Sequence, residues 1–407
     1  MDQLSRRKML IAGGALGALG VIGAGSPATA RSSWDWSPSG SVAGSGSATD
    51  PQWVWDDEAD QVIGDVLRRG EVPRVNQLLR GWIRNDQPLP SGLPADLRDF
   101  MESARQLPAW ADRAKLDLAG QFNVKKGIYT GALYGLGSGL MSCAIPREAR
   151  AVYYSKGGAD MKDRISKTAR LGYDVGDLDA YRPTGSMIVT AVKTRMVHAA
   201  VRNLLPQSPG WSQTSGGQTI PISLADVMVT WHSLATFVNR KLGDWKVRVT
   251  PAESAAYLHV WQVTAHMLGV RDDYIPATWD AANAQSKQLL DPVLGPTPEG
   301  KALCELLLDI IADVDGGLTR PLVAGFSRYT LGDRLGDWIG LDREPFWTPT
   351  ISTVWPILVA FREGLVGLPL VPAAAWTVEE FIRKFVLLFL SEAQYDPIEI
   401  PTANRQF

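Results

Sequence analysis

A single histidine, His198, lies in a helical segment whose neighbouring residues are suited to hold a cofactor. At about 100° of rotation per residue, the segment 186–205 places several apolar residues on the same side as His198, and Arg195 and Arg202 flank it. An imidazole on an apolar surface with guanidinium groups at its edge suits haem, because iron binds a neutral histidine and the propionates bind arginine. A core histidine with satisfied nitrogens is the alternative for the same pattern.

A second set of polar residues precedes this segment, in the predicted helix 160–173. Arg164, Lys167 and Thr168 are spaced i, i+3 and i+4 and therefore share one face, together with Leu171. They form a candidate cationic wall opposite His198. A solvated cationic helix face is the alternative.

The most apolar stretch that follows the N-terminal leader is 127–145, which has a glycine at every fourth position from Gly127 to Gly139. This repeat predicts a buried helix whose backbone approaches another helix or a flat ligand closely; in a membrane it would be a helix-pairing face. Glu148 follows directly after Pro146, so its carboxylate is expected near the interior. Arg328, among aromatic residues, is a third candidate for a propionate partner.

Two other sets of residues bear on metal chemistry. His259 and His266 lie seven residues apart on a predicted helix that also carries Glu253, which leaves an exported zinc hydrolase as an alternative, although adjacent-turn zinc ligands are usually i, i+4. Cys143 and Cys304 form no C-x-x-C or C-x-x-C-H motif, which excludes a cysteine-rich zinc or iron–sulfur site and covalent c-type haem. Both a disulfide and two free thiols remain open for this pair.

The elements that must position these residues are predicted to be helices throughout. Apolar residues recur at spacings of three and four, no sustained period-two segment occurs, and Pro and Gly separate the helices. Two starts are well marked: Ser223 with Asp226, and Thr250-Pro251 with Glu253. The fold class is therefore all-α. The predicted helices cover 62–67, 75–82, 97–107, 110–122, 127–145, 160–173, 186–205, 223–242, 251–269, 279–290, 299–314, 354–365 and 377–393.

The N-terminus has the pattern of an export signal. Arg6-Arg7 precede an apolar run that ends in an A-x-A site, which predicts a twin-arginine signal over residues 1–30 and no membrane span after cleavage. This route exports folded proteins and so favours a cofactor protein. Residues 31–56 form a Ser-, Gly- and Trp-rich arm, whose tryptophans are expected to attach it to the body, and 57–407 a single helical domain. The net charge of −2 argues against nucleic acid or an anionic membrane as partner.

Several of these residues together resemble a known family. The stretch Arg164-Ile165-Ser166-Lys167-Thr168, the helix with Lys193-Thr194-Arg195-Met196-Val197-His198 and the twin-arginine signal resemble the latex clearing proteins, which are secreted haem-containing rubber oxygenases. The resemblance implies an all-α, globin-like core with additional flanking helices and one non-covalent b-type haem.

It also implies roles for the site residues. His198 is expected to be the proximal iron ligand and Lys167 a distal ligand in a closed resting form. Arg164 and Thr168 are expected to hold the distal side, and Glu148 to act as the acid/base. The implied function is a secreted dioxygenase, expected to be a monomer, that cleaves cis-1,4-polyisoprene internally with dioxygen to oligo-isoprenoids with aldehyde and ketone ends. A haem protein without oxygenase activity, carrying electrons or binding gas, is the main alternative.

Overall fold

The computed structural model describes residues 34–44, 49–154, 170–172, 174–214, 220–312, 319–365 and 398–404. The chain divides into Met1–Trp34 and Asp35–Phe407, and the second unit contains all the helices described below. In the described ranges the regular structure is helical, and only an isolated bridge pairs Ser41 with Pro276. The predicted all-α class is confirmed.

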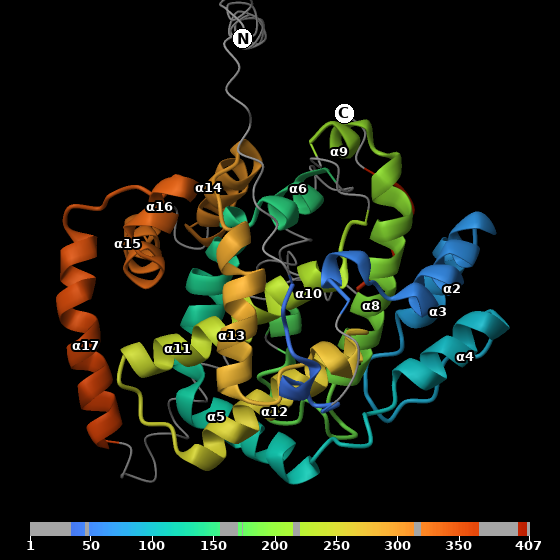
Figure 1. Ribbon diagram of the computed structural model, residues 1–407, viewed down its shortest axis with the longest axis horizontal. Helices are drawn as coiled ribbons and strands as arrows, with labels where there is room; N and C mark the ends of the chain where they lie inside the picture. The colour runs from blue at the N-terminus through green and yellow to red at the C-terminus, as the bar shows by residue number, and fades with distance from the viewer. Residues whose placement is uncertain are drawn as a thin grey trace, which may run out of the picture. The chain divides into compact units, whose positions relative to one another are not determined.

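The described residues form fifteen α-helices, which Figure 1 shows in chain order from blue to red. They are α2 (Asp57–Arg68), α3 (Val72–Leu79), α4 (Ala95–Ala104), α5 (Arg113–Ala132), α6 (Pro146–Tyr154), α8 (Met187–Leu204), α9 (Pro209–Thr214), α10 (Leu224–Trp231), α11 (Phe237–Asp244), α12 (Pro251–Met267), α13 (Trp279–Leu289), α14 (Pro298–Ala312), α15 (Arg320–Leu331), α16 (Asp333–Ile339) and α17 (Trp347–Leu365).

The helix starts that the sequence marks are present. Ser223 caps α10 with Asp226, and Thr250 caps α12 with Glu253; in both, the two side chains bond reciprocally to the backbone. Each capping box satisfies amide groups that the first helical turn leaves without partners. The predicted helix 377–393 lies outside the described residues.

Helix α5 does not end at the glycine-rich stretch but changes its pitch there. It continues into a π-helical turn, Leu133–Gly139, and a second π-helical turn, His232–Thr236, links α10 to α11. Such turns often occur at functional sites. The apolar spacing of the sequence did not reveal either turn.

The glycines of this stretch differ in their surroundings. A Cβ atom added at Gly137 would lie 2.8 Å from the ring of Phe237, so the chain is closely packed there. Cβ atoms added at Gly131 and Gly135 would meet no described atom within 4 Å, and Gly135 is exposed. Close approach to another helix therefore occurs at Gly137, which is outside the four-residue repeat, and the space beside Gly131 and Gly135 is open.

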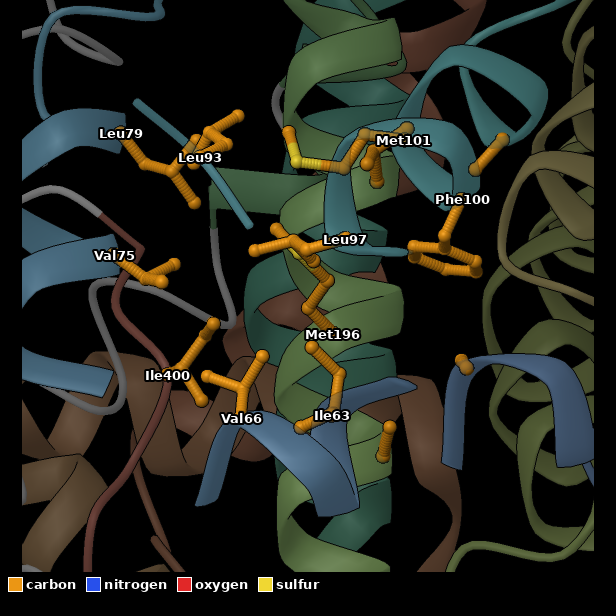
Figure 2. Packing of buried hydrophobic residues seen from close by; sticks show 14 of the residues in the cluster. Ile63, Val66, Val75, Leu79, Leu93, Leu97, Phe100, Met101, Met196 and Ile400 are labelled. Atoms are coloured by element: carbon orange, nitrogen blue, oxygen red, sulfur yellow. The ribbon is translucent and has the colours of Figure 1, made fainter. Parts of the chain in front are cut away.

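One hydrophobic cluster holds α8 against α2, α3 and α4. Figure 2 shows Met196 of α8 among Ile63 of α2 and Leu97 of α4, all of them buried. At about 100° per residue, Val192 and Met196 lie roughly 120–160° around the helix from His198. The cluster therefore buries the side of α8 opposite His198 and fixes the direction in which that histidine points.

A second hydrophobic cluster contains both cysteines. Cys143 and Cys304 are buried and both are free thiols. A hydrogen bond with Cys304, together with burial, raises the pKa of the Cys143 thiol. Of the two states left open by the sequence, the structure has the reduced pair.

The N-terminal arm contacts the helical body through one of its tryptophans. The Trp36 side chain is buried and its Nε1 donates to the Asp273 carbonyl at 3.3 Å. Trp53 and Trp55 are 50% and 39% exposed. The expected attachment is seen at Trp36. Next to Trp53, the Val54 carbonyl accepts a hydrogen bond from the Leu224 amide of α10 at 2.7 Å.

No helix among the described residues is by itself long and apolar enough to cross a membrane; residues 113–144 and 146–154 pass that test only as a pair, bent by 90°.

Candidate cofactor and active site

His198 lies on α8 with its imidazole in a neutral state. Its Nδ1 atom is buried and has no hydrogen-bond partner among the described residues. Burial, and after it the positive charge of Arg202, lowers the pKa of His198 to about 4. At neutral pH the ring is therefore uncharged, which is the form that binds a metal ion.

Arg202, one helical turn from His198, has a guanidinium group that is only partly paired. Its Nε donates to Asp60 of α2 at 2.6 Å, and its Nη1 donates to the Ile222 carbonyl at 3.0 Å. Its Nη2 is buried and has no partner in the part of the chain that the structure describes. Burial raises the pKa of Asp60 to about 6, and Arg202 opposes this shift. The geometry thus leaves one buried donor beside His198.

Arg195, three residues before His198, is already paired. Its guanidinium binds both carboxylate oxygens of Asp56 and reaches Glu58 at 3.1 Å, and it lies over the Phe100 ring at 4.9 Å. Asp56 is the N-cap of α2. The two arginines of α8 are therefore both bound by acidic residues of the first turns of α2.

Arg328 lies on α15, where its buried guanidinium binds α16 and the turn after it. Its partners are the carboxylates of Asp333 at 3.0 Å and Asp337 at 2.8 Å and three backbone carbonyls. These contacts give Arg328 a structural role in joining α15 to α16.

The segment 220–222 links α8 to α6. Arg202 binds the Ile222 carbonyl, while Arg147 of α6 approaches the Ile220 carbonyl at 3.5 Å and binds Asp226 at 3.1 Å. Ile222 has a φ angle of 52°, a conformation that a β-branched residue rarely adopts. The segment is held in this strained form next to Arg202.

Glu148 lies on α6, one residue after Arg147. It accepts a short hydrogen bond from the Thr230 hydroxyl of α10. Burial is the main cause that raises the pKa of Glu148 to about 8, and the nearby Asp226 carboxylate adds to it, while the Thr230 hydrogen bond opposes it. The expectation that this carboxylate lies near the interior is confirmed. At neutral pH it is mostly protonated.

Arg164, Lys167 and Thr168 lie outside the described residues. The chain that follows them is tied to α8, because Asp174 accepts a hydrogen bond from Thr190 at 2.5 Å and from Arg170 at 3.4 Å. Their roles at the site stay predictions.

The histidines of the zinc alternative are bound to other groups. His259 Nε2 accepts from the Asp112 amide at 2.8 Å, and His266 Nδ1 contacts Asp272 at 2.7 Å. Glu253 is part of the α12 capping box and binds Lys125 at 2.9 Å. No group of three or more potential metal ligands occurs among the described residues. These contacts do not fit a zinc site.

Comparison with known proteins defines the class of this protein. A family described as "ER-bound oxygenase mpaB/B'/Rubber oxygenase, catalytic domain" matches residues 127–362, more than half of the chain, and the chain belongs to this family. Within it, the chain is 70% identical over 405 residues to a rubber oxygenase of Streptomyces sp. (strain K30), covering 100% of both sequences.

A solved structure described as latex clearing protein in the closed state is also similar to this chain. It has a TM-score of 0.83 at 71% identity, and the match covers 90% of this chain and 99% of that chain. The resemblance inferred from the site motifs is thereby confirmed over the full length.

Sequence reasoning missed the residues that hold the two arginines of α8. Asp56 and Asp60 lie 139 and 142 positions from their arginine partners, and Thr230 lies 82 positions from Glu148. Nothing in local spacing marks such long-range pairs.

Proposed function

We propose that this protein is a b-type haem dioxygenase that cleaves the double bonds of cis-1,4-polyisoprene internally, giving oligo-isoprenoids with aldehyde and ketone ends. The observation that carries the proposal is the full-length identity of 70% to a rubber oxygenase. The match of the oxygenase catalytic domain over residues 127–362 supports the same reaction class.

The residues around His198 fit a haem. The buried Nδ1 of His198 and the buried Nη2 of Arg202 are polar atoms without hydrogen-bond partners among the described residues. Buried polar atoms without partners are uncommon in native proteins. His198 would hold the iron as a neutral imidazole, and Arg202 would bind a propionate. Haem supplies the iron chemistry that activates dioxygen.

The remaining cationic residues contribute unequally to this proposal. Arg195, Arg202 and Arg328 each bind a carboxylate. Arg202 also keeps a buried Nη2 without a partner among the described residues, so it is the arginine that the contacts favour as propionate partner. Arg164 and Thr168 are proposed to line the opposite side, with Lys167 as a reversible iron ligand, on the basis of the family resemblance.

Glu148 is proposed to move a proton during cleavage. Its pKa of about 8 means that about a tenth of the carboxyl groups are ionised at pH 7, and this fraction can accept an allylic proton. The Thr230 hydroxyl holds the carboxyl group in place. The substrate has no charge and no hydrogen-bonding group, so its binding depends on apolar contact.

The wider setting of the enzyme follows from the same resemblance. We propose a globin-like core within the all-α fold and export by the twin-arginine route, which the Arg6-Arg7 motif supports. We also propose that the protein acts as a monomer.

The experiment is to purify the protein and record its absorption before and after reduction, and then to incubate it with rubber latex under air. A Soret band, a pyridine haemochrome of haem b and new carbonyl products are expected. A haem protein that leaves latex unchanged would be a non-catalytic carrier, and a colourless active protein would refute the haem assignment.

A further inference from the structure

The last described helix, α17, presents a row of large apolar side chains to the surface. Phe346, just before the helix, is 66% exposed, and within it Val354, Ile357, Leu358 and Phe361 are 42%, 63%, 52% and 66% exposed. At about 100° per residue, these five side chains fall within one third of the helix circumference. We call this set the α17 face.

The opposite side of α17 is firmly packed, so the exposure is not that of a loose helix. The ring centroid of Trp355 lies 4.8 Å from that of Phe326 and 5.0 Å from that of Trp245. Val359 is 2% exposed. Glu363 makes a buried ion pair with Lys126 of α5 at 2.6 Å. The helix is therefore held to α15 and α5 through one side and shows the α17 face on another.

The stretch that carries the α17 face has no charged residue from Pro345 to Phe361. Val354 and Phe361 are separated by about 10 Å along the axis, and Phe346 and Phe361 by about 22 Å. Soluble proteins rarely leave a continuous apolar row of this kind without a partner. The partner that matches it has neither charge nor hydrogen-bonding groups.

We propose that the α17 face docks the enzyme onto the surface of the hydrocarbon polymer, so that a chain can be taken from an insoluble particle. This inference rests on the proposed function, which supplies an uncharged polyisoprene as substrate. Polar side chains would lose hydration on such a surface without gaining partners, whereas apolar ones gain from leaving water. The side chains of the α17 face are all apolar.

The test compares two double variants of the haem-loaded protein. Ile357→Glu with Phe361→Glu places charges in the α17 face. Ser212→Glu with Gln213→Glu places the same charges at exposed positions of another helix, α9. Each protein is mixed with latex particles and sedimented, and oxygen uptake is measured with latex and with a short oligo-isoprenoid dispersed in detergent.

The α17-face variant is expected to lose on the order of tenfold or more in adsorption to latex, because two large apolar side chains no longer leave water. Its rate on latex should fall in parallel, while its rate on the short substrate and its Soret band stay unchanged. The control variant should behave as wild type.

Several results would overturn the proposal. Unchanged adsorption would do so directly. A lower melting temperature in the α17-face variant alone would mean that another part of this chain covers the face, and conversion of a dimer to a monomer would mean that a second copy does. Stronger wild-type binding to phosphatidylcholine vesicles than to latex would make the partner a lipid surface. If latex binds through the α17 face but is not cleaved, the docking stands and the proposed function fails.

Discussion

Replacing Glu148 by glutamine should make the protein more stable at high pH. The pKa of this carboxyl group is raised from 4.5 to about 8, chiefly by burial. The unfolded chain therefore ionises from about pH 4.5 upward, while the folded chain keeps its proton until about pH 8. The protonated carboxyl group contributes to the free energy of unfolding. This contribution is fully present below pH 4.5 and is lost as the pH rises through 8.

The size of the effect follows from the shift. At about 1.4 kcal/mol per pKa unit, a shift from 4.5 to about 8 corresponds to roughly 5 kcal/mol as an upper value. Glutamine carries no charge at any of these pH values and can still accept the Thr230 hydrogen bond. The variant is expected to match wild type at pH 4.5 and to exceed it by several kcal/mol at pH 9.

The assay is urea unfolding of both proteins at the two pH values. Glu305→Gln on α14 is the matched control, because that side chain is exposed and its replacement should give equal differences at both pH values. If Glu148→Gln also gives equal differences, the carboxyl group is not withdrawn from water and its proposed role as proton acceptor loses its basis.

Three further outcomes are expected. Arg202→Gln should speed haem transfer to an apo-globin scavenger by roughly tenfold, as for loss of a charge-assisted hydrogen bond, whereas Arg195→Gln should lower the free energy of unfolding and leave haem transfer nearly unchanged. Gly137→Ala should lower the free energy of unfolding by about 1–3 kcal/mol, because its Cβ would lie 2.8 Å from Phe237. Gly135→Ala, with open space at that position, should be close to neutral in the same urea titration. The reverse order would refute the packing described for the π-helical turn Leu133–Gly139. In oxygen uptake with latex, the rate should rise with pH to a midpoint near 8 if Glu148 accepts a proton, and Glu148→Gln should lack that rise.

The helices were predictable because their causes are local. Residues 186–205 were predicted as a helix, and α8 covers Met187–Leu204; an apolar pattern and a following proline are enough for that. The capping boxes at Ser223 and Thr250 involve residues three positions apart. The apolar α17 was predicted only from residue 354, because Pro349 and the β-branched residues before it obscure a start at Trp347.

The site was predictable in part, for a related reason. His198 was found because its apolar surrounding is visible in the flanking sequence. The apolar run before Glu148 predicted only its interior position, and its role came from the family resemblance. The pairing of Arg195 with Asp56 and of Arg202 with Asp60 joins parts of the chain that are far apart in sequence. The helical spacing that placed both arginines beside His198 could not show that only Arg202 keeps a buried donor without a partner among the described residues. Lys193 lies far around α8 from His198. It is buried and donates to the Leu79 carbonyl at 2.8 Å, and local spacing could not show this contact either.

The most direct test of a haem dioxygenase that acts on polyisoprene is the stoichiometry of its reaction with latex. We expect one dioxygen to be consumed for each aldehyde end formed by the wild-type protein, with no carbonyl product from a His198→Ala variant that has lost its haem. Aldehyde formation without oxygen uptake, or full activity of the variant without haem, would contradict the account.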